Sequence, residues 1–452
     1  MAARSLPVRV AIAAVAATLT PSLRAQSTGA GPQTPQHRAD PFQGMDRNGR
    51  IPKVDLPIEL EHRGRWRYFP EARLMEGNIF ERFLVSSFFT PIVFREPDVG
   101  TGGGVAITDV DFRNQRRQEL ANFVLTYTTE GQQTFAFNWR RWLHHIDLPG
   151  GGVVQDERSF MHGYAGYVKS LTSRFYGLGQ TPATAESSYT RERSDLRFYY
   201  QFTEPGPADN FLVRLHASVE HNNLASGRVT GVPITSAAYP SLFAAADDHD
   251  MLWLSLTASY DTRDSLHNPY QGFELGVRAE NAVLQSGGDV GGLYSLFGSK
   301  VFKLPPLLHD GGDDKEEHPP TDCLAFGSFV TAAAGDLPFY SLPSLGGSDT
   351  LRGFINNRFT DRTAWHAVAE YRFWAIPRGF ALTDWVRVER LGLALFAEVG
   401  SVAPKVADLF DRTQQSWGFS LRASLERTAL FRVDFGFSDE DTNVTIAYGL
   451  SF

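Results

Sequence analysis

From Thr101 onward, hydrophobic residues alternate with polar or small residues along one segment after another. Clear examples are 134–140, 196–202, 213–220, 273–280, 419–426 and 431–438. Successive side chains of a β-strand point to opposite faces of the sheet. Each segment therefore predicts a strand with one apolar and one polar face, and the polar face has many arginines and glutamates.

The length of these strands indicates what the apolar face contacts. The segments commonly run for about 9–12 residues, the length that a tilted strand needs to cross a bilayer. A charged polar face is typical of a water-filled lumen. The pattern predicts an all-β protein, a transmembrane β-barrel whose apolar face contacts lipid. A soluble antiparallel sheet around a core is the alternative.

The number of strands follows from a count and a rule. Fifteen strands can be recognised from Thr101 to the C-terminus. Single-chain bacterial barrels have an even number of strands. We therefore predict a 16-stranded antiparallel barrel, with the remaining strand in the weakest stretch, Thr172–Gln180.

The N-terminal part of the chain has a different composition. Arg4 and Arg9 accompany a short apolar run, Val10–Leu19. Such a run is typical of a signal peptide, because a helix that crosses a bilayer needs about 20 apolar residues. We predict three parts: a signal peptide at 1–25, a periplasmic linker at 26–90 and the barrel at 91–452. This organisation predicts export to the outer membrane of a Gram-negative envelope.

The composition narrows the chemistry. The formal net charge of −8 argues against nucleic acid as a partner. The single cysteine, Cys323, provides neither a disulfide framework nor a zinc spacing. Residues 309–318 form a charged turn that could hold a cation, but a solvated turn is favoured. No Ser/His/acid set stands out. We predict no metal, no cofactor and no enzymatic activity, with a barrel enzyme as an alternative.

The C-terminal residues predict the final strand, Asn443–Phe452. Its predicted lipid face includes Tyr448, Leu450 and Phe452. A terminal Phe with apolar residues at alternate positions resembles the signal by which outer-membrane barrels are recognised for insertion.

The two sides of the barrel can also be predicted. If the C-terminus lies in the periplasm, the long loops Asn223–Asp250 and Pro338–Asp361 face outside. Long outer loops and short periplasmic turns are the usual asymmetry of such barrels, and we expect it here.

Two motifs are more specific than the barrel pattern. The first begins with Tyr260–Asp264, followed by Asn-Pro and Gly, which are tight-turn residues. Its key residues are Asp261, Thr262, Arg263, Pro269 and Gly272. The second combines Leu345-Gly346-Gly347 with Leu351, Arg352, Gly353 and Phe354.

Together with the glycine run Gly100–Gly104, these motifs resemble the BamA/TamA-like outer-membrane family, also called the bacterial surface antigen family. The resemblance covers Pro91–Phe452. Full members carry POTRA repeats before the barrel. This chain shows no clear repeat there, so it is similar to a short subclass.

The resemblance implies a function and partners. It implies a barrel that assists the insertion or export of proteins or lipids, with a lateral gate between the first and last strands. We expect outer-membrane lipid and lipopolysaccharide around the barrel, and unfolded outer-membrane proteins or lipids as clients. A passive narrow channel or a structural barrel is the alternative.

The resemblance also implies a role for Arg352. In the family, this arginine lies on an extracellular loop that folds into the lumen, where acidic residues of the inner wall hold it. The alternation independently points Glu370 and Glu398 inward, on the two strands after the loop. An unpaired buried charge is costly, so we predict that Arg352 pairs with both. The family usually has Asp at the position of Glu398. An exposed Arg352, with both glutamates lining water, is the alternative.

Overall fold

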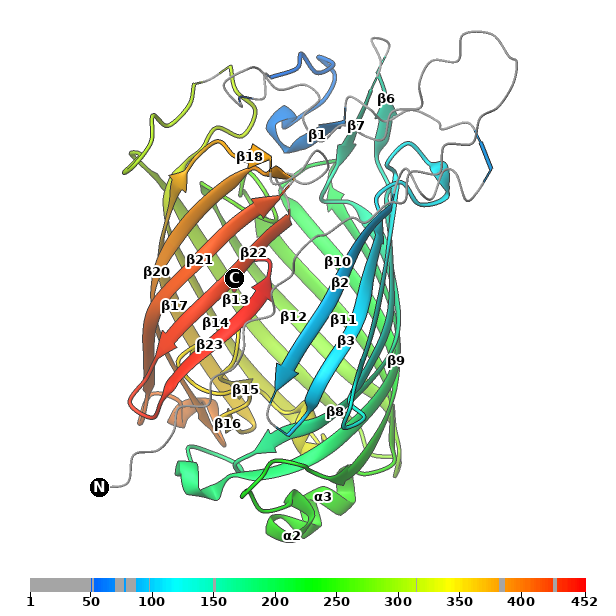
Figure 1. Ribbon diagram of the computed structural model, residues 1–452, viewed down its shortest axis with the longest axis vertical. Helices are drawn as coiled ribbons and strands as arrows, with labels where there is room; N and C mark the ends of the chain where they lie inside the picture. The colour runs from blue at the N-terminus through cyan, green and yellow to red at the C-terminus, as the bar shows by residue number, and fades with distance from the viewer. Residues whose placement is uncertain are drawn as a thin grey trace.

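The computed structural model describes residues 50, 53–69, 77–78, 87–96, 98–148, 152–313, 315–381, 387–425 and 429–452. The predicted signal peptide lies outside the described residues, as does much of the predicted linker. One antiparallel sheet of 16 strands dominates the structure and curls into a barrel (Figure 1). The all-β class and the predicted number of strands are confirmed.

Each strand of the main sheet pairs with the next one along it, from β2 to β23. In order, the strands are β2 (Ser87–Glu96), β3 (Gly100–Asp109), β4 (Glu119–Thr128), β5 (Gln133–Trp142), β8 (Phe160–Phe175), β9 (Ser187–Glu204), β10 (Phe211–Ser226), β11 (His249–Asp261), β12 (Gly272–Gln285), β13 (Gly291–Leu304), β14 (Asp322–Gly335), β17 (Thr363–Ile376), β20 (Arg390–Ala403), β21 (Gln414–Leu425), β22 (Ala429–Phe437) and β23 (Thr442–Tyr448).

The predicted position of the sixteenth strand is wrong. That strand is β2, which pairs with β3 along its whole length. The stretch Thr172–Gln180 adds no strand of its own, because β8 continues into it as far as Phe175, past a register shift after Ser170. Sequence reasoning misses β2 because Pro91 interrupts it and its apolar residues do not alternate strictly.

The alternation separates the two faces of the barrel. On β12, Leu275 and Val277 are 58% and 55% exposed on the outer face. On β9, Leu196 is 62% exposed, whereas the neighbouring Asp195 is buried. An outer belt of exposed apolar side chains is what lipid covers in a barrel of this kind. None of the helices in the described part of the chain is both long and apolar enough to cross a membrane.

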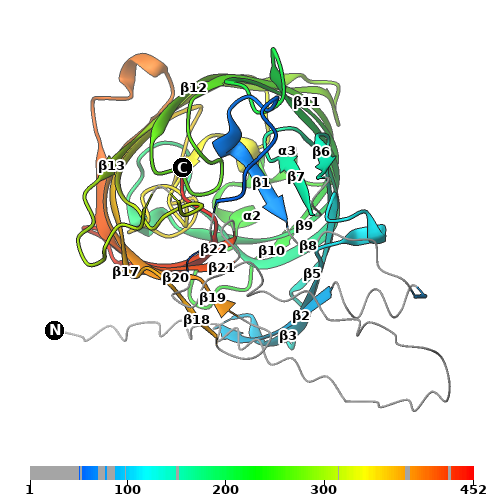
Figure 2. The same cartoon turned by 90° about the horizontal axis from the view of Figure 1, so that it is seen from above.

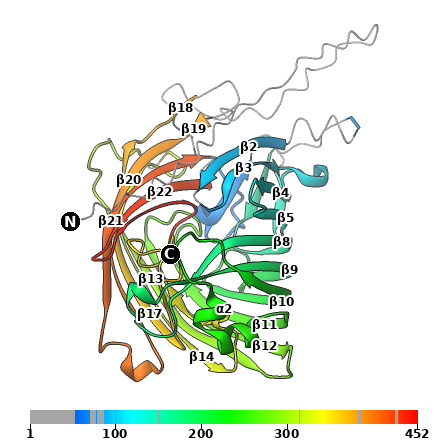
Figure 3. The same ribbon diagram turned by 60° about the horizontal axis from the view of Figure 1, so that its bottom comes forward.

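One end of the barrel, called here the loop end, holds most of the helical turns (Figures 1 and 3). It includes α2 (Thr235–Ala238), α3 (Pro240–Ala246), and the short paired strands β15 (Ser344–Leu345) and β16 (Phe359–Thr360). The two loops that we predict to face outside both lie at this end. Short 3-10 helices occur at Arg63–Arg65 (η1), Phe112–Asn114 (η2), Ala183–Ala185 (η3), Phe339–Ser341 (η4) and Val406–Asp408 (η5).

The opposite end, called here the mouth end, has longer turns than we expect. The turn 143–159 contains β6 (His145–Asp147) and β7 (Val153–Asp156), and the turn 305–321 joins β13 to β14. A small hairpin of β18 (Phe380–Ala381) and β19 (Arg387–Val388) follows β17. The expected short turns are therefore found only in part: residues 205–210 join β9 to β10, whereas the turn 143–159 and the hairpin after β17 form small sheets of their own.

The N-terminal strap, residues 53–69, lies across the mouth end. Its strand β1 (Trp66–Phe69) pairs with β7, and β1, β7 and β6 form a small sheet. Arg65 donates hydrogen bonds to the carbonyl of Ala208 at 2.8 Å and to Oδ1 of Asn210 at 2.7 Å. Seen from above, β1 lies within the outline of the barrel (Figure 2). The strap therefore covers part of the mouth.

The C-terminal tail, Gly449–Phe452, does not complete β23. The strand ends at Tyr448, and Gly449 takes a φ of +86°, which favours glycine. Phe452 then lies in the lumen, with its ring centroid 4.6 Å from the guanidinium carbon of Arg372. The prediction that β23 continues to Phe452 with this side chain on the lipid face is wrong, because the backbone turns inward at Gly449.

Candidate functional site in the barrel lumen

The loop between β14 and β17, called here the lumen loop, folds back into the barrel. Its two arms are joined by β15 and β16, which pair at Ser344↔Thr360 and Leu345↔Phe359. Gly346 and Gly347 take φ values of +109° and +113°, so the chain can turn sharply after β15. The predicted inward-folded loop is confirmed.

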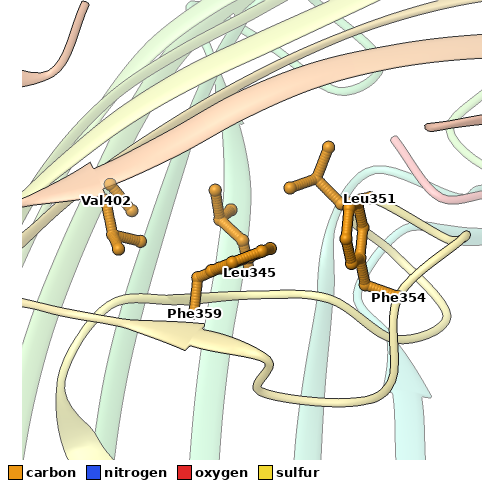
Figure 4. Close-up of a cluster of buried hydrophobic side chains, with 6 residues drawn as sticks. Leu345, Leu351, Phe354, Phe359 and Val402 are labelled. Atoms are coloured by element: carbon orange, nitrogen blue, oxygen red, sulfur yellow. The ribbon is translucent and has the colours of Figure 1, made fainter. Parts of the chain in front are cut away.

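A buried apolar cluster anchors the lumen loop (Figure 4). Its members are Leu345, Leu351, Phe354 and Phe359 of the loop, with Ala364 of β17 and Val402 of β20. Burying one Leu or Phe side chain contributes about 1.5–3 kcal/mol. Leu351 and Phe354, which belong to the second motif, therefore act in packing and help to set how the loop sits against the inner wall.

Arg352 is fully enclosed and faces both predicted carboxylates. Its Nη2 atom is 2.6 Å from Oε1 of Glu370, and its Nε atom is 3.0 Å from Oε1 of Glu398. The backbone N–H of Arg352 also donates to Oε2 of Glu398 at 2.6 Å. The longer Glu398 side chain, where the family usually has Asp, thus reaches both the side chain and the backbone of Arg352.

Two further partners of Arg352 are missing from the sequence prediction. Oδ1 of Asp434 on β22 is 3.7 Å from Nη1, and the ring centroid of Phe396 is 3.5 Å from the guanidinium carbon. Burial lowers the pKa of Arg352, but Glu370, Glu398 and Asp434 outweigh it, and the pKa lies above its ordinary value. The alternation along β22 does point Asp434 inward. It does not show which inward carboxylates meet the loop.

The lumen loop also binds the last hairpin, β22–β23. The side-chain amide of Asn443 donates to the carbonyls of Arg352 at 3.1 Å and Phe354 at 3.0 Å. Nε and Nη2 of Arg358 donate to the two carboxylate oxygens of Glu440, at 2.6 Å each. The position of the loop is therefore coupled to the position of the last strand.

Glycines allow the loop backbone to touch the barrel wall. A Cβ atom on Gly436 of β22 would lie 2.6 Å from the backbone nitrogen of Gly353. A Cβ atom on Gly353 would lie 2.9 Å from Cβ of Ser416. Neither position has space for a side chain. Position 353 of the second motif therefore requires glycine, because the loop backbone packs directly against the barrel wall.

The first motif forms a buried ionic turn between β11 and β12. The carboxylate of Asp261 accepts hydrogen bonds from the backbone N–H of Arg263 at 2.9 Å and from its Nε and Nη2 at 3.0 Å each. Nη2 of Arg263 is also 2.6 Å from Glu274. Arg158, in the segment after β7, donates to the carbonyl of Asp261 at 3.2 Å. The motif thus links the turn containing β7 to the barrel wall.

The remaining residues of the first motif close the turn and meet the C-terminal tail. The N–H of Thr262 donates to the carbonyl of Phe273 at 2.8 Å, and Oγ1 of Thr262 accepts from the N–H of Phe273 at 3.0 Å. Pro269 precedes Tyr270, which belongs to a buried cluster with Val301, Cys323 and Ala325, and Phe452 packs against this cluster. The role of Tyr448, Leu450 and Phe452 as an insertion signal stays a prediction.

Gly272 provides a test of this turn. Its φ is +106°, and a Cβ atom there would lie 2.5 Å from Cα of Arg263. We expect Gly272→Ala to lower the free energy of unfolding by about 1–3 kcal/mol, through strain and overpacking. The measurement is the temperature at which the compact form is lost in heat-modifiable gel migration.

A matched control separates the two causes. Gly131 has a φ of +92°, and a Cβ atom there would have no other atom within 4 Å. Gly131→Ala therefore carries the backbone strain alone, and its effect should be smaller. Equal losses in the two variants would show that packing at Gly272 is not responsible.

The charged turn 309–318 is held by arginines. Nη1 of Arg378 is 2.9 Å from Oδ1 of Asp310, and its Nη2 is 2.9 Å from Oε2 of Glu316. Nη1 of Arg50 is 3.0 Å from Oδ2 of Asp313. Within the ranges that the structure describes, no three His, Cys, Asp or Glu side chains gather closely enough to hold a metal ion.

These features define a class of protein: a 16-stranded β-barrel whose lumen holds an arginine-bearing loop. The sequence profile of the Omp85 superfamily domain matches residues 164–452, which is more than half of the chain. The chain therefore belongs to the Omp85 superfamily and is an outer-membrane β-barrel.

Two solved structures are similar in fold. The crystal structure of BamA from Haemophilus ducreyi lacking POTRA domains 1–3 shares 13% identity at a TM-score of 0.47, covering 81% of this chain and 70% of that one. CdiB from Acinetobacter baumannii shares 9% identity at a TM-score of 0.43, covering 78% of this chain and 57% of that one. No curated protein sequence matches the chain. Because both TM-scores are low, membership of the superfamily rests on the profile match.

Proposed function

We propose that this barrel assists the insertion or export of proteins or lipids at the outer membrane, and that clients are handled at the seam between β2 and β23. Membership of the Omp85 superfamily supports this class of function. One observation carries the proposal: Asn443 of β23 binds the loop backbone at Arg352, so the lumen loop is tied to a seam strand.

The geometry of the seam supports an extended client. β2 has 10 residues and β23 has 7. The C-terminal tail enters the lumen and does not extend β23 along β2. A strand edge can accept an extended segment of another chain through backbone hydrogen bonds, and a bilayer strongly favours such pairing. A strand of an unfolded outer-membrane protein is the client that fits this edge.

The test is the outer-membrane composition of a deletion strain. We expect a specific set of β-barrel proteins, or a lipid component, to fall in abundance. The wild-type gene should restore it, as should Arg362→Ala, a change in the same loop. Arg352→Ala, compared at equal amounts of folded barrel, should restore it poorly. An unchanged protein and lipid composition after deletion would contradict the proposal.

A passive channel is the second candidate, and the contents of the lumen argue for a small conductance. The lumen loop is anchored on the inner wall, Phe452 lies in the interior, and the strap covers part of the mouth. Loss of specific outer-membrane proteins in the deletion strain favours the assembly role. A large, steady conductance of the purified protein favours the channel.

The strap yields a prediction for the same recordings. Arg65 holds the strap to the turn between β9 and β10, and the buried Trp66 packs with Val154 and Ala208. We expect the double variant Arg65→Ala, Trp66→Ala to release the strap and raise single-channel conductance several-fold. Arg63→Ala is the control, because Arg63 donates to Ile58 inside the strap. Equal conductance in the wild type and the double variant would show that the strap is no barrier.

A further inference from the structure

The inner wall of β5, β8, β9 and β10 has an excess of positive charge. Its inward positions, which alternate with the outward apolar residues, carry five arginines: Arg140, Arg191, Arg193, Arg197 and Arg214. The same strands point two carboxylates inward, Asp195 and Glu220. We refer to these five arginines as the arginine wall.

The carboxylates do not neutralise the arginine wall. Asp195 is shared by two arginines, at 3.7 Å from Nε of Arg193 and in an ion pair with Arg197. Glu220 accepts a hydrogen bond from the indole N–H of Trp253 at 3.1 Å. Arg140 and Arg214 form no ion pair with a carboxylate among the residues that the structure describes.

The contacts of Arg140 and Arg214 are with neutral groups. The guanidinium carbon of Arg140 is 4.6 Å from the ring centroid of Phe160. Nε of Arg214 donates to Oε1 of Gln201 at 2.7 Å. These contacts orient the guanidinium groups without bringing a carboxylate into contact with them.

A row of stacked rings lies between these two arginines. Arg140 is paired in register with His162, His162 with Tyr199, and Tyr199 with His216. The ring centroids of His162 and Tyr199 are 5.4 Å apart, and those of Tyr199 and His216 are 4.2 Å apart, at interplanar angles of 16° and 7°. The rings are therefore held in fixed positions on the wall.

The stacked row also has an unused polar atom. Nε2 of His216 is buried and has no hydrogen-bond partner within the described part of the chain. Arg214 precedes His216 on the same face of β10. A ligand oxygen could therefore meet a guanidinium and an imidazole at neighbouring positions.

The carboxylates nearest to these four strands have cation partners of their own: Glu274 pairs with Arg263, Glu280 with Arg278 and Glu157 with Arg67. Those of the opposite wall serve the lumen loop. Glu370, Glu398 and Asp434 surround Arg352. The arginine wall thus faces the lumen with a net positive charge, in a chain whose formal net charge is −8. Clustered charges of one sign on low-dielectric walls attract and concentrate counter-ions.

We propose that two residues of the arginine wall, Arg140 and Arg214, bind a phosphate group in the lumen together with His216. Guanidinium groups match the geometry of phosphate oxygens and form strong charge-assisted hydrogen bonds with them. A phosphate group can carry two negative charges, which suits two arginines without an ion-pair partner better than a single carboxylate does. The group can belong to a soluble phosphate compound or to a lipid headgroup.

The test measures binding by titration calorimetry on the full-length barrel in a neutral detergent. Pyrophosphate and a short-chain phosphatidic acid are the two probes. Saturable binding of pyrophosphate alone supports a soluble ligand, and saturable binding of the lipid alone supports a headgroup. Binding of both, in competition, supports a site open to either source. In each case the affinity should fall as the salt concentration rises.

Variants locate the site. We expect Arg140→Gln with Arg214→Gln to weaken binding by about tenfold or more, since two charge-assisted contacts are lost. Arg141→Gln is the matched control, because Arg141 neighbours Arg140 on β5 but is paired with a carboxylate. Its Nη1 atom is 2.6 Å from Oε1 of Glu119. Heat-modifiable migration should show that all variants are folded. The proposal is overturned if neither probe binds, if an acidic peptide binds where the phosphates do not, or if the double variant binds as tightly as the wild type.

Discussion

Replacing Arg352 by alanine is expected to lower the free energy of unfolding of the barrel by about 3–5 kcal/mol, the cost of removing one partner of a buried ion pair. Arg352 is 1% exposed and lies among Glu370, Glu398 and Asp434. Without the guanidinium, three carboxylates face one another in the lumen. We expect the loop to leave its position and the compact form to be lost at a markedly lower temperature.

Two comparisons show whether the ion pairs are responsible. Arg362→Ala removes an arginine at the end of the same loop, where its Nη2 donates to the carbonyl of Gly335 at 2.8 Å, and should have little effect. Arg352→Lys keeps the charge but not the planar fork, so its stability should lie between those of the wild type and the alanine variant. If Arg352→Ala and Arg362→Ala lose equal stability, the ion pairs do not hold the loop.

Gly436→Ala is expected to have the second-largest effect. A Cβ atom at Gly436 would overlap the carbonyl group of Arg352 and lie 2.6 Å from the backbone nitrogen of Gly353. Both are backbone atoms, so no side-chain rotation can relieve the overlap. We expect a loss of about 3 kcal/mol, the upper end of the usual range for overpacking, together with increased protease access to the lumen loop.

A glycine with free space provides the control. A Cβ atom on Gly163 of β8 would find its nearest neighbour, the Trp139 ring, at 3.5 Å. Gly163→Ala should therefore leave stability unchanged or raise it slightly, because alanine lowers the entropy of the unfolded chain. Normal protease resistance of the loop in Gly436→Ala would contradict the observed approach of loop and wall.

The two carboxylates of the site illustrate how far sequence reasoning extends. Glu370 and Glu398 could be assigned to the inner wall because β-strand side chains alternate, and this period is a local property of the backbone. Asp434 follows the same rule on β22. Its contact with Arg352 could not be predicted, because it depends on how the lumen loop crosses the interior to reach a later strand.

The C-terminal tail and the strap show the opposite case. The alternation up to Tyr448 predicts an outward Phe452, yet Gly449 turns the backbone and Phe452 packs against the cluster containing Tyr270. Likewise, no pattern in 53–69 indicates pairing with β7 or contact with Asn210. Both arrangements join segments that are far apart in the sequence.

The sequence by itself determined the strand periodicity, the outward apolar face, the inward charges and the number of strands. Each of these follows from the alternation of side chains along one strand and from the rule that closed bacterial barrels have an even number of strands. Only the tertiary structure decided which strand is the sixteenth, which carboxylates surround Arg352, and where the strap and tail lie. These depend on contacts across the lumen, where curvature of the sheet brings distant segments together, and no local pattern encodes those distances.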